Sequence, residues 1–274
     1  QMKIKILIPV YNDWKSVFKV LEEINNLDLN SEFRISVIII NDASNHDLPD
    51  LEKSLKNIDS IKVLNMNKNQ GHTRSIAVGL KYIFEKEDFD YAIPMDGDGE
   101  DRPEEIKVFL DKVENSKGKT FVGERVKRSE KTIFKICYQI HKLITLVFTG
   151  KSLKFGNYTC LSKSTVEKLI NEKATWNSFS GSLTKVDSDL TPIPSVRGPR
   201  YFGPSQMSFI KLIKHSLAII SVFRKTFLIR SALFIVTYIL MIKSNASIIT
   251  SLPLVLLLIA VYLVSNLSLR ENMD

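Results

Sequence analysis

Acidic side chains crowd one short stretch of a chain whose formal net charge is +8. Six consecutive positions hold four carboxylates: Asp96, Asp98, Glu100 and Asp101. Residues i and i+2 of an extended turn point the same way, so Asp96 and Asp98 are expected to converge. Converging carboxylates suit Mg²⁺ or Mn²⁺, which keep positions open for water and substrate phosphates. Gly97 and Gly99 would let such a ligand approach the backbone closely.

The end of this acidic turn reads as the start of a helix. Asp101 is expected to cap a helix that begins at Pro103, where the missing N–H of proline costs nothing. Glu104 and Glu105 suit the positive N-terminal end of that helix. Acidic turns are common on protein surfaces, so whether this turn is a functional metal site depends on its position in the fold.

Strand-like and helix-like segments alternate through the first half of the chain. Apolar, β-rich runs predict strands at 3–10, 33–42, 61–65, 91–95 and 119–125. Amphipathic runs predict helices at 13–27, 48–57, 73–86 and from 103 onward. This alternation predicts an α/β fold with a parallel, doubly wound sheet. Ligands of such sheets bind beyond the carboxyl ends of the strands, which directs attention to loops 9–13, 41–46, 66–74 and 96–102.

The second half begins with a strongly amphipathic segment at 132–148. Core packing would explain it, and so would contact with a membrane surface, which is favoured by basic residues on the other faces: Lys131, Lys135, His141 and Lys142. Segment 150–200 is irregular, with short strand-like pieces and a helix near 163–172. Residues 205–220 again form an amphipathic, basic segment.

The last fifty residues are the most apolar part of the chain. Residues 244–269 carry no charge and 226–242 are interrupted only by Arg230, which can snorkel toward the membrane surface. We interpret them as a membrane-spanning helical hairpin, the alternative being a buried hairpin of a soluble protein. Basic residues at one end place that end and the preceding domain in the cytoplasm: Arg224, Lys225, Arg230 and Arg270.

This organisation divides the chain into a catalytic domain (1–204), an amphipathic juxtamembrane helix (205–225) and a two-helix transmembrane hairpin with a short tail (226–274). The basic residues are otherwise scattered and no nucleic-acid-binding motif occurs, so a membrane is the expected partner and nucleic acid is not. Paired membrane helices could also mediate a homo-oligomer, although the sequence has no GxxxG motif.

Five ordered motifs resemble those of a known family. ILIPVYND, VIIINDAS, NKNQGHTRSIAVGL, MDGDGEDRPEEI and FVGERVKRSE look like the successive motifs of inverting glycosyltransferases of family 2, which have a GT-A fold. The likeness covers roughly residues 2–125. RGPRYFGPSQMSF, followed by two apolar helices, resembles the polyprenyl-phosphate glycosyltransferase branch, which includes dolichyl-phosphate mannose synthases.

The resemblance assigns the donor side of the site. It implies a metal site formed by Asp96, Asp98 and Glu100, and it implies nucleotide-sugar-binding residues: Pro9, Tyr11, Asp13, Asp42, Asn69, Gly71, Arg74, Asp96 and Gly97. The donor would be a UDP- or GDP-linked sugar. Many relatives have two acids where this chain has Asn41-Asp42. Asp42 could instead be only a cap, and the residues of the third loop only a helix-entry turn.

The resemblance also implies an acceptor, a polyprenyl (undecaprenyl or dolichyl) phosphate. Acceptor-binding residues would be Arg125, Arg200 and Ser205, although Gln206 replaces the usual Lys of that element, and catalytic residues would be Asp98, Arg125 and Arg200. A hydroxyl of a glycolipid or cell-surface glycan is the alternative acceptor. It would need a base, for which the second half offers Asp187 or Asp189. A silent sugar-nucleotide-binding module is a third hypothesis, which the intact DxD disfavours.

Overall fold

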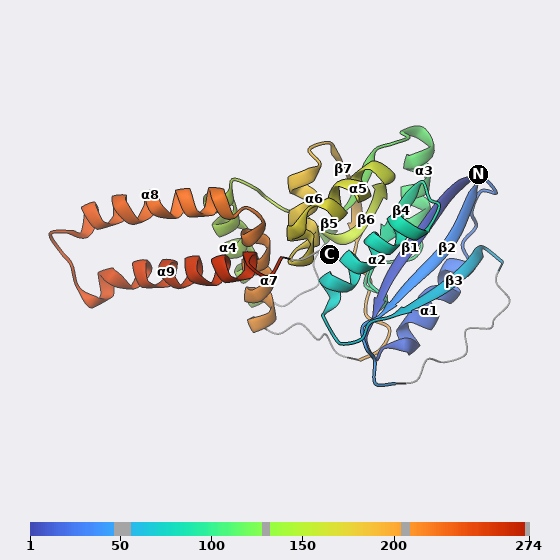
Figure 1. Ribbon diagram of the computed structural model, residues 1–274, viewed down its shortest axis with the longest axis horizontal. Coiled ribbons are helices and arrows are strands. Elements are labelled where there is room, and N and C mark those ends of the chain that lie inside the picture. The colour runs from blue at the N-terminus through green and yellow to red at the C-terminus, as the bar shows by residue number, and fades with distance from the viewer. Residues whose placement is uncertain (47–55, 128–131, 204–208, 272–274) are drawn as a thin grey trace.

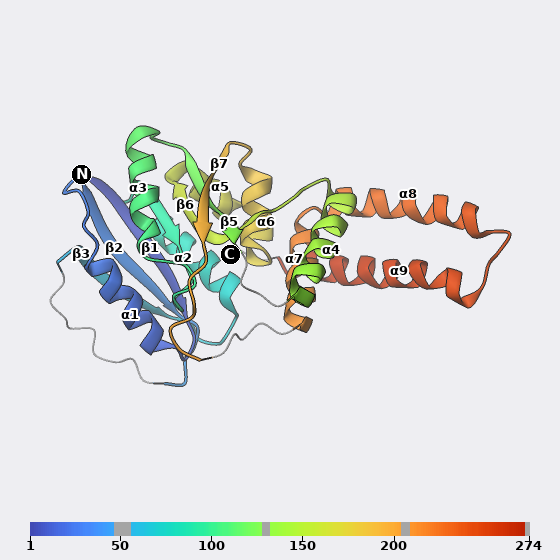
Figure 2. The ribbon, with the colours of Figure 1, turned by 180° about the vertical axis from the view of Figure 1, so that it is seen from behind.

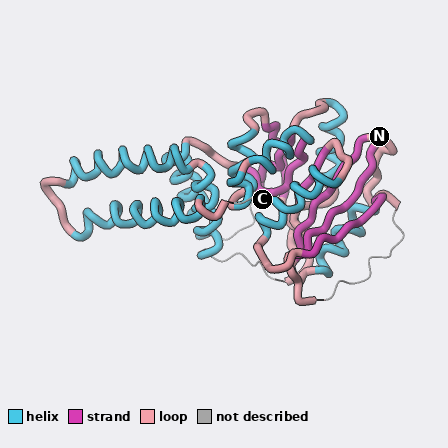
Figure 3. The backbone as a smooth tube through the Cα atoms, in the orientation of Figure 1, coloured by secondary structure: helices cyan, strands magenta, loops and turns pink. Residues whose placement is uncertain are grey.

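The computed structural model describes residues 1–46, 56–127, 132–203 and 209–271, of which 127, 132–138 and 209 are described by their backbone alone. A mixed sheet of the order β3-β2-β1-β4-β6-β5-β7 organises the first three quarters of the chain (Figure 3). Its strands are β1 (Met2–Val10), β2 (Phe33–Asn41), β3 (Ile58–Asn65), β4 (Tyr91–Pro94), β5 (Thr120–Lys127), β6 (Phe155–Ser162) and β7 (Leu190–Val196).

The direction of each strand decides where the loops meet. β1 pairs in parallel with β2 and β4, and β2 pairs in parallel with β3. β6 runs antiparallel to both β4 and β5, whereas β5 and β7 are parallel to each other. Two reversals restore the original direction, so every strand except β6 ends at one edge, the carboxyl edge. The predicted mostly parallel sheet is confirmed.

Helices cover both faces of the sheet (Figure 1 and Figure 2). On one face, α1 (Trp14–Asn25) and α3 (Glu105–Asn115) pack on alternate residues of β1, among them Ile4, Ile6 and Ile8. On the other face, Leu7, Ile38 and Ile40 pack against helices on that side: α2 (His72–Lys86), α5 (Lys163–Asn171) and α6 (Phe179–Val186). Burial on both faces explains why β2 reads as a nearly continuous apolar run.

Segment 150–200 is more regular than its sequence predicts. It supplies β6 in the interior of the sheet, the predicted helix α5, a 3₁₀ helix at Lys173–Trp176, α6, and the edge strand β7. Polar residues weaken the strand pattern of β6, and β7 contains two prolines, Pro192 and Pro194. Proline is tolerated there because β7 lies at the end of the sheet order. The helix predicted at 48–57 lies largely outside the described residues.

The C-terminal helices form a structure of their own beside the sheet (Figure 1). α4 (Thr132–Thr149) and α7 (Phe209–Val222) lie at the base of a hairpin made by α8 (Arg224–Ile242) and α9 (Ile248–Ser268). Both hairpin helices are long and apolar enough to cross a membrane, and only 11% of each span is buried. The low burial disfavours the alternative of a buried hairpin in a soluble protein.

Arg230, near the start of α8, has partners within the protein. Its Nη1 donates to the carbonyl oxygens of Val147 (2.7 Å) and Leu146 (3.3 Å), and its guanidinium lies beside Gly150. Both carbonyls belong to the last turn of α4. Leu146 O also accepts the N–H of Gly150 over 2.8 Å. The arginine therefore caps α4 and joins it to α8, so that snorkelling is not needed to satisfy its charge.

We expect Arg230→Met to lower the stability of the detergent-solubilised protein by about 1–3 kcal/mol, because it removes a charged donor from the carbonyl of Val147. Thermal unfolding followed by circular dichroism measures the effect. Lys225→Met, an exposed basic residue in the first turn of the same helix, is the matched control and should change little. Equal melting temperatures for Arg230→Met and the wild type would contradict the capping role.

Candidate active site

The carboxyl edge of the sheet collects the loops that were singled out from the sequence. Asp13 follows β1, Asp42 follows β2, and the acidic turn follows β4. The loop after β7, residues 197–203, reaches the same edge and crosses the acidic turn. We call it the strap.

Arginines of the strap meet the acidic turn directly. Arg197 pairs with Glu100, and its Nη2 lies 3.3 Å from Asp96 Oδ2. Arg200 Nη1 lies 2.5 Å from Asp98 Oδ2, and its Nη2 lies 3.4 Å from Asp13 Oδ2. Asp96 and Asp98 thus each face a guanidinium group of the same loop.

Backbone hydrogen bonds hold the strap in place. Gly198 N–H donates to Glu100 O and Tyr201 N–H donates to Asp98 O, each over 2.9 Å. Close approach requires glycine at Gly99, which has φ of +89° and whose added Cβ would lie 2.6 Å from the Tyr201 ring. Gly97, by contrast, packs against Ile8 and Val17 of the core, so a ligand could meet only its backbone.

Asp101 does not cap α3, contrary to the sequence-based expectation. Its buried carboxylate accepts the N–H of Asp96 over 2.8 Å, and α3 begins only at Glu105. Burial raises the pKa of Asp101 well above its ordinary value, and the charge of Asp96 adds to this rise. Asp101 thus stabilises the acidic turn from its buried side, whereas Asp96, Asp98 and Glu100 remain partly exposed.

Burial and mutual repulsion make this turn costly to charge. Burial raises the pKa of Asp98, and the neighbouring Asp96 raises it further. Burial likewise raises the pKa of Glu100. Burial opposes the charged form of Arg197, but the surrounding carboxylates, led by Asp96, outweigh it and raise the pKa of the guanidinium. The turn therefore favours cations, as its sequence predicts.

The donor set fits a hard divalent ion held jointly with a ligand. Asp96 Oδ1 is buried and receives no hydrogen bond, although His72 Nε2 lies 2.8 Å away. Among the described residues, no three His, Cys, Asp or Glu side chains are gathered as a ready-made metal cage. Mg²⁺ commonly takes one or two carboxylates and completes its shell with substrate phosphates and water. Asp96 and Asp98 could provide those carboxylates.

Asp42 anchors the third loop. Its buried carboxylate accepts the N–H of Gln70 on Oδ1 (2.7 Å) and the N–H of Gly71 on Oδ2 (2.8 Å). Both N–H groups precede α2, so Asp42 ties the third loop to the end of β2 and does not cap the first turn of the helix. The anchor also positions His72 beside Asp96.

We expect Asp42→Ala to destabilise the protein by about 2–3 kcal/mol, because two N–H groups lose their acceptor. Asp42→Asn keeps one acceptor and should cost less. Thermal unfolding of both variants measures the difference. An unchanged melting temperature in Asp42→Ala would show that the third loop does not depend on this carboxylate.

The remaining donor-side residues lie around the same edge. Pro9 is the half-buried penultimate residue of β1, and Tyr11 is exposed. Asp13 precedes α1 and accepts a hydrogen bond from the hydroxyl of Ser16 over 2.7 Å. Asn69 is exposed in the third loop. Arg74 bonds Gln70 and lies over the ring of Trp176, 5.1 Å from its centroid.

The residues predicted for the acceptor side do not all lie at the carboxyl edge. Arg125 lies near the end of β5 at the carboxyl edge, where its charge favours the ionised form of Asp101. Ser205 falls outside the described residues. Asp187 and Asp189 lie at the start of β7, while the strap leaves its other end. A seven-residue strand spans roughly 23 Å, so neither acid can serve as a base at the acidic turn.

Arg197 is the residue that sequence reasoning missed. It stands three positions before Arg200 in the quoted motif RGPRYFG, and the pairing of two arginines with several acids was the available signal. Asn12 was missed too. It adopts φ of +57° and joins the first two loops through Ser44 and Asn45.

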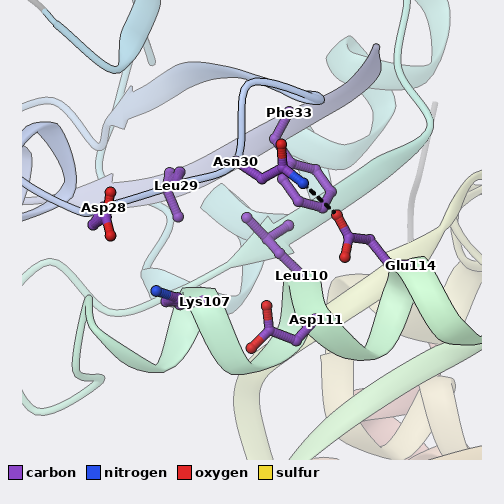
Figure 4. Close-up of a pocket in the computed structure, with 8 residues that line it drawn as sticks. All are labelled: Asp28, Leu29, Asn30, Phe33, Lys107, Leu110, Asp111 and Glu114. Atoms are coloured by element: carbon purple, nitrogen blue, oxygen red, sulfur yellow. Dashed lines mark hydrogen bonds between the residues drawn. The ribbon is translucent and has the colours of Figure 1, made fainter.

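A pocket of about 270 Å³ lies elsewhere, between α3 and the segment that leads into β2 (Figure 4). It is lined by Asp28, Leu29, Asn30, Phe33, Lys107, Leu110, Asp111 and Glu114. Because Phe33 begins β2, this pocket is at the amino edge of that strand. It contains none of the predicted site residues, so we base the site on the carboxylates and arginines of the carboxyl edge.

Comparison with known proteins gives the family. A family model described as glycosyl transferase family 2 matches residues 5–179, more than half of the 274-residue chain. The chain belongs to this family. The match spans the sheet from β1 to β6 and includes the acidic turn of this family 2 chain.

Proteins with assigned activities share about a quarter of their aligned residues with this chain. This family 2 chain is 26% identical over 226 residues to the undecaprenyl-phosphate 4-deoxy-4-formamido-L-arabinose transferase of Proteus mirabilis, and 25% identical to that of Klebsiella pneumoniae. Each match covers 77% of this chain and 64% of the relative. The chain therefore spans less than two thirds of these relatives' length.

Solved structures support the fold. The glucosyl-3-phosphoglycerate synthase of Mycobacterium tuberculosis, in complex with Mn²⁺, UDP-glucose and phosphoglyceric acid, superposes with a TM-score of 0.56 at 13% identity, covering 82% of this chain and 79% of the synthase. The mannosyl-3-phosphoglycerate synthase of Rubrobacter xylanophilus gives 0.52 at 10% identity, covering 81% and 72%. At these identities the likeness concerns the fold alone, and it confirms the expected GT-A architecture.

Proposed function

We propose that this family 2 chain is a membrane-anchored, metal-dependent, inverting glycosyltransferase that moves a sugar from a nucleoside-diphosphate sugar to a polyprenyl phosphate. The observation that carries the proposal is the acidic turn at the carboxyl edge, facing Arg197 and Arg200. Carboxylates suit a divalent ion, and guanidinium groups suit phosphate. The names of the undecaprenyl-phosphate transferases support the same acceptor class.

The mechanism follows from which groups are charged. Asp96 and Asp98, joined by Glu100, would hold Mg²⁺ or Mn²⁺, which when bound would stabilise negative charge on the departing nucleoside diphosphate. A lipid phosphate has a second pKa of about 6 and is largely dianionic near pH 7, so it needs no base. Arg125 and Arg200 would position that phosphate, and its oxygen would attack the anomeric carbon opposite the leaving group, inverting it.

The C-terminal helices support a membrane setting for this chemistry. α8 and α9 would span the bilayer, and their basic ends, which include Arg224 and Arg270, would remain with the catalytic domain in the cytoplasm. α4 and α7 pack at the base of the hairpin and expose large apolar side chains: Ile140, Leu143, Ile144, Leu146, Val147, Ile210 and Ile213. These would enter the membrane surface and bring the lipid head group to the site.

Sugar transfer by the purified full chain tests the proposal. A radiolabelled panel of UDP- and GDP-linked sugars is offered with polyprenyl phosphate and, as matched acceptor, with the corresponding polyprenol. We expect label in the phosphate lipid only, and unchanged activity in Asp187→Asn and Asp189→Asn. Label that enters a hydroxyl acceptor but never the lipid phosphate would overturn the proposal in favour of the glycolipid or glycan alternative.

A further inference from the structure

Arg197 contacts the same carboxylates that would hold the metal. Its guanidinium bridges Asp96 and Glu100, at the positions where a cation shared by these two acids would bind. These contacts use Asp96 Oδ2 and Glu100 Oε2. A divalent ion that takes either of these oxygens would compete with this arginine, because both cations are drawn to the same carboxylates.

We propose that Arg197 is an exchangeable counter-cation: it competes with the divalent ion for Asp96 and Glu100, and when metal and nucleotide bind together it turns to the donor diphosphate. This inference rests on the proposed function, because it concerns the metal and diphosphate of that reaction. It makes Arg197 a positioning residue that couples metal binding to nucleotide binding.

The anchoring of the strap restricts this exchange to side chains. Gly198 and Tyr201 are tied by backbone hydrogen bonds to the acidic turn. The Tyr201 hydroxyl bonds Glu23 of α1, and Lys19 lies over the Tyr201 ring at 4.3 Å from its centroid. With the backbone held at both places, the long arginine side chain can swing while its Cα stays beside the site.

The hydrogen bonding of Arg197 leaves capacity for an anion. Its Nε is buried and donates to no acceptor, and the same holds for Nε of Arg200. An unsatisfied buried donor is costly, and a diphosphate oxygen would provide the missing acceptor. The Nε–H groups of both arginines could therefore donate to a bound anion beside the acids.

The charge balance explains why metal and nucleotide should bind together. Four carboxylates, Asp13, Asp96, Asp98 and Glu100, face the guanidinium groups of Arg197 and Arg200, so part of their charge is already neutralised. A divalent ion alone would have to compete with these guanidinium groups for the acids. A divalent ion that arrives with a diphosphate brings an anion for the displaced guanidinium. Mn²⁺ should consequently bind weakly alone and strongly with a nucleoside diphosphate.

Mn²⁺ binding to the detergent-solubilised full chain tests the exchange, measured by electron paramagnetic resonance with Mn²⁺ alone and with UDP or GDP added. We expect Arg197→Gln to bind Mn²⁺ alone about tenfold more tightly than the wild type, since one partly buried competing charge is gone. The same variant should bind the nucleotide with Mn²⁺ about tenfold more weakly. Arg197→Lys keeps the charge but cannot bridge both acids, so it should fall between the two.

Arg102→Gln is the matched control, because Arg102 lies next to the acidic turn but pairs with Glu104. It should change Mn²⁺ affinity less than twofold, about the effect of a screened surface charge. Mn²⁺ affinity in both Arg197 variants that equals or falls below that of the wild type would overturn the exchange. Unchanged Mn²⁺ binding in the doubly substituted Asp96→Asn, Asp98→Asn protein would instead overturn the metal site of the proposed function. Should Arg197→Gln fail to fold, Arg197→Lys decides the outcome.

Discussion

Replacement of Asp96 or Asp98 by Asn is expected to lower sugar transfer by about a thousandfold or more, because each change would remove a charged ligand of the proposed metal site. Both side chains are mostly buried at the carboxyl edge, with 18% and 17% of their surfaces exposed. Asn keeps the volume and one acceptor oxygen, so folding should be preserved. Transfer from the radiolabelled donor that the wild type uses measures the loss.

Asp111→Asn is the control for this pair. Asp111 is an exposed acid on α3 that lines the pocket at the other edge, so its loss should leave transfer unchanged. Melting temperatures of all three variants should lie close to that of the wild type. Full activity in the doubly substituted Asp96→Asn, Asp98→Asn protein would show that these acids do not hold a catalytic metal.

Arg200→Ala should lower kcat/KM by about a hundredfold to a thousandfold, the usual effect of removing one charged donor from a transition-state site. Arg200 is the residue that joins the first loop to the acidic turn, through Asp13 and Asp98. Its loss would remove both the proposed phosphate contact and this bridge. Arg200→Lys should recover only part of the activity, since an ammonium cannot contact two groups as a planar guanidinium does.

Steady-state kinetics with varied acceptor separates the two effects of Arg200. A role in acceptor binding raises KM for the lipid phosphate, and a role in the transition state lowers kcat. Arg34→Ala is the matched control, since Arg34 also pairs with an aspartate, Asp59 at 2.6 Å, but lies at the start of β2. Wild-type kcat/KM in Arg200→Ala would rule out both roles.

Much of the catalytic half could be predicted from sequence because its signals are local. Short apolar, β-rich runs predicted β1, β2 and β4 to within about two residues, and helical periodicity predicted α1 and α4 equally well. Strand β6 was not predicted, because its polar residues obscure the period of two and only its neighbours in the sheet stabilise it as a strand. The residue types of the proposed metal site could be predicted, since Asp96 and Asp98 stand two positions apart.

Contacts between distant segments were beyond the reach of such patterns. Arg197 meets Asp96 across 101 residues of chain, and only the direction of β7 brings the strap to the acidic turn. The same direction places Asp187 and Asp189 at the far end of β7, which removes them as bases although their sequence position suggested the role.

The amino-acid sequence by itself determined the family motifs, the acidic turn, the alternation of strands and helices, and the apolar hairpin, because each depends on residues within a few positions of one another. The tertiary structure alone decided which charges meet: Asp101 with the backbone of Asp96, Arg230 with the end of α4, and Arg197 with the predicted metal ligands. These pairings depend on strand order, strand direction and helix packing, which bring together groups whose spacing in the chain carries no periodic signal.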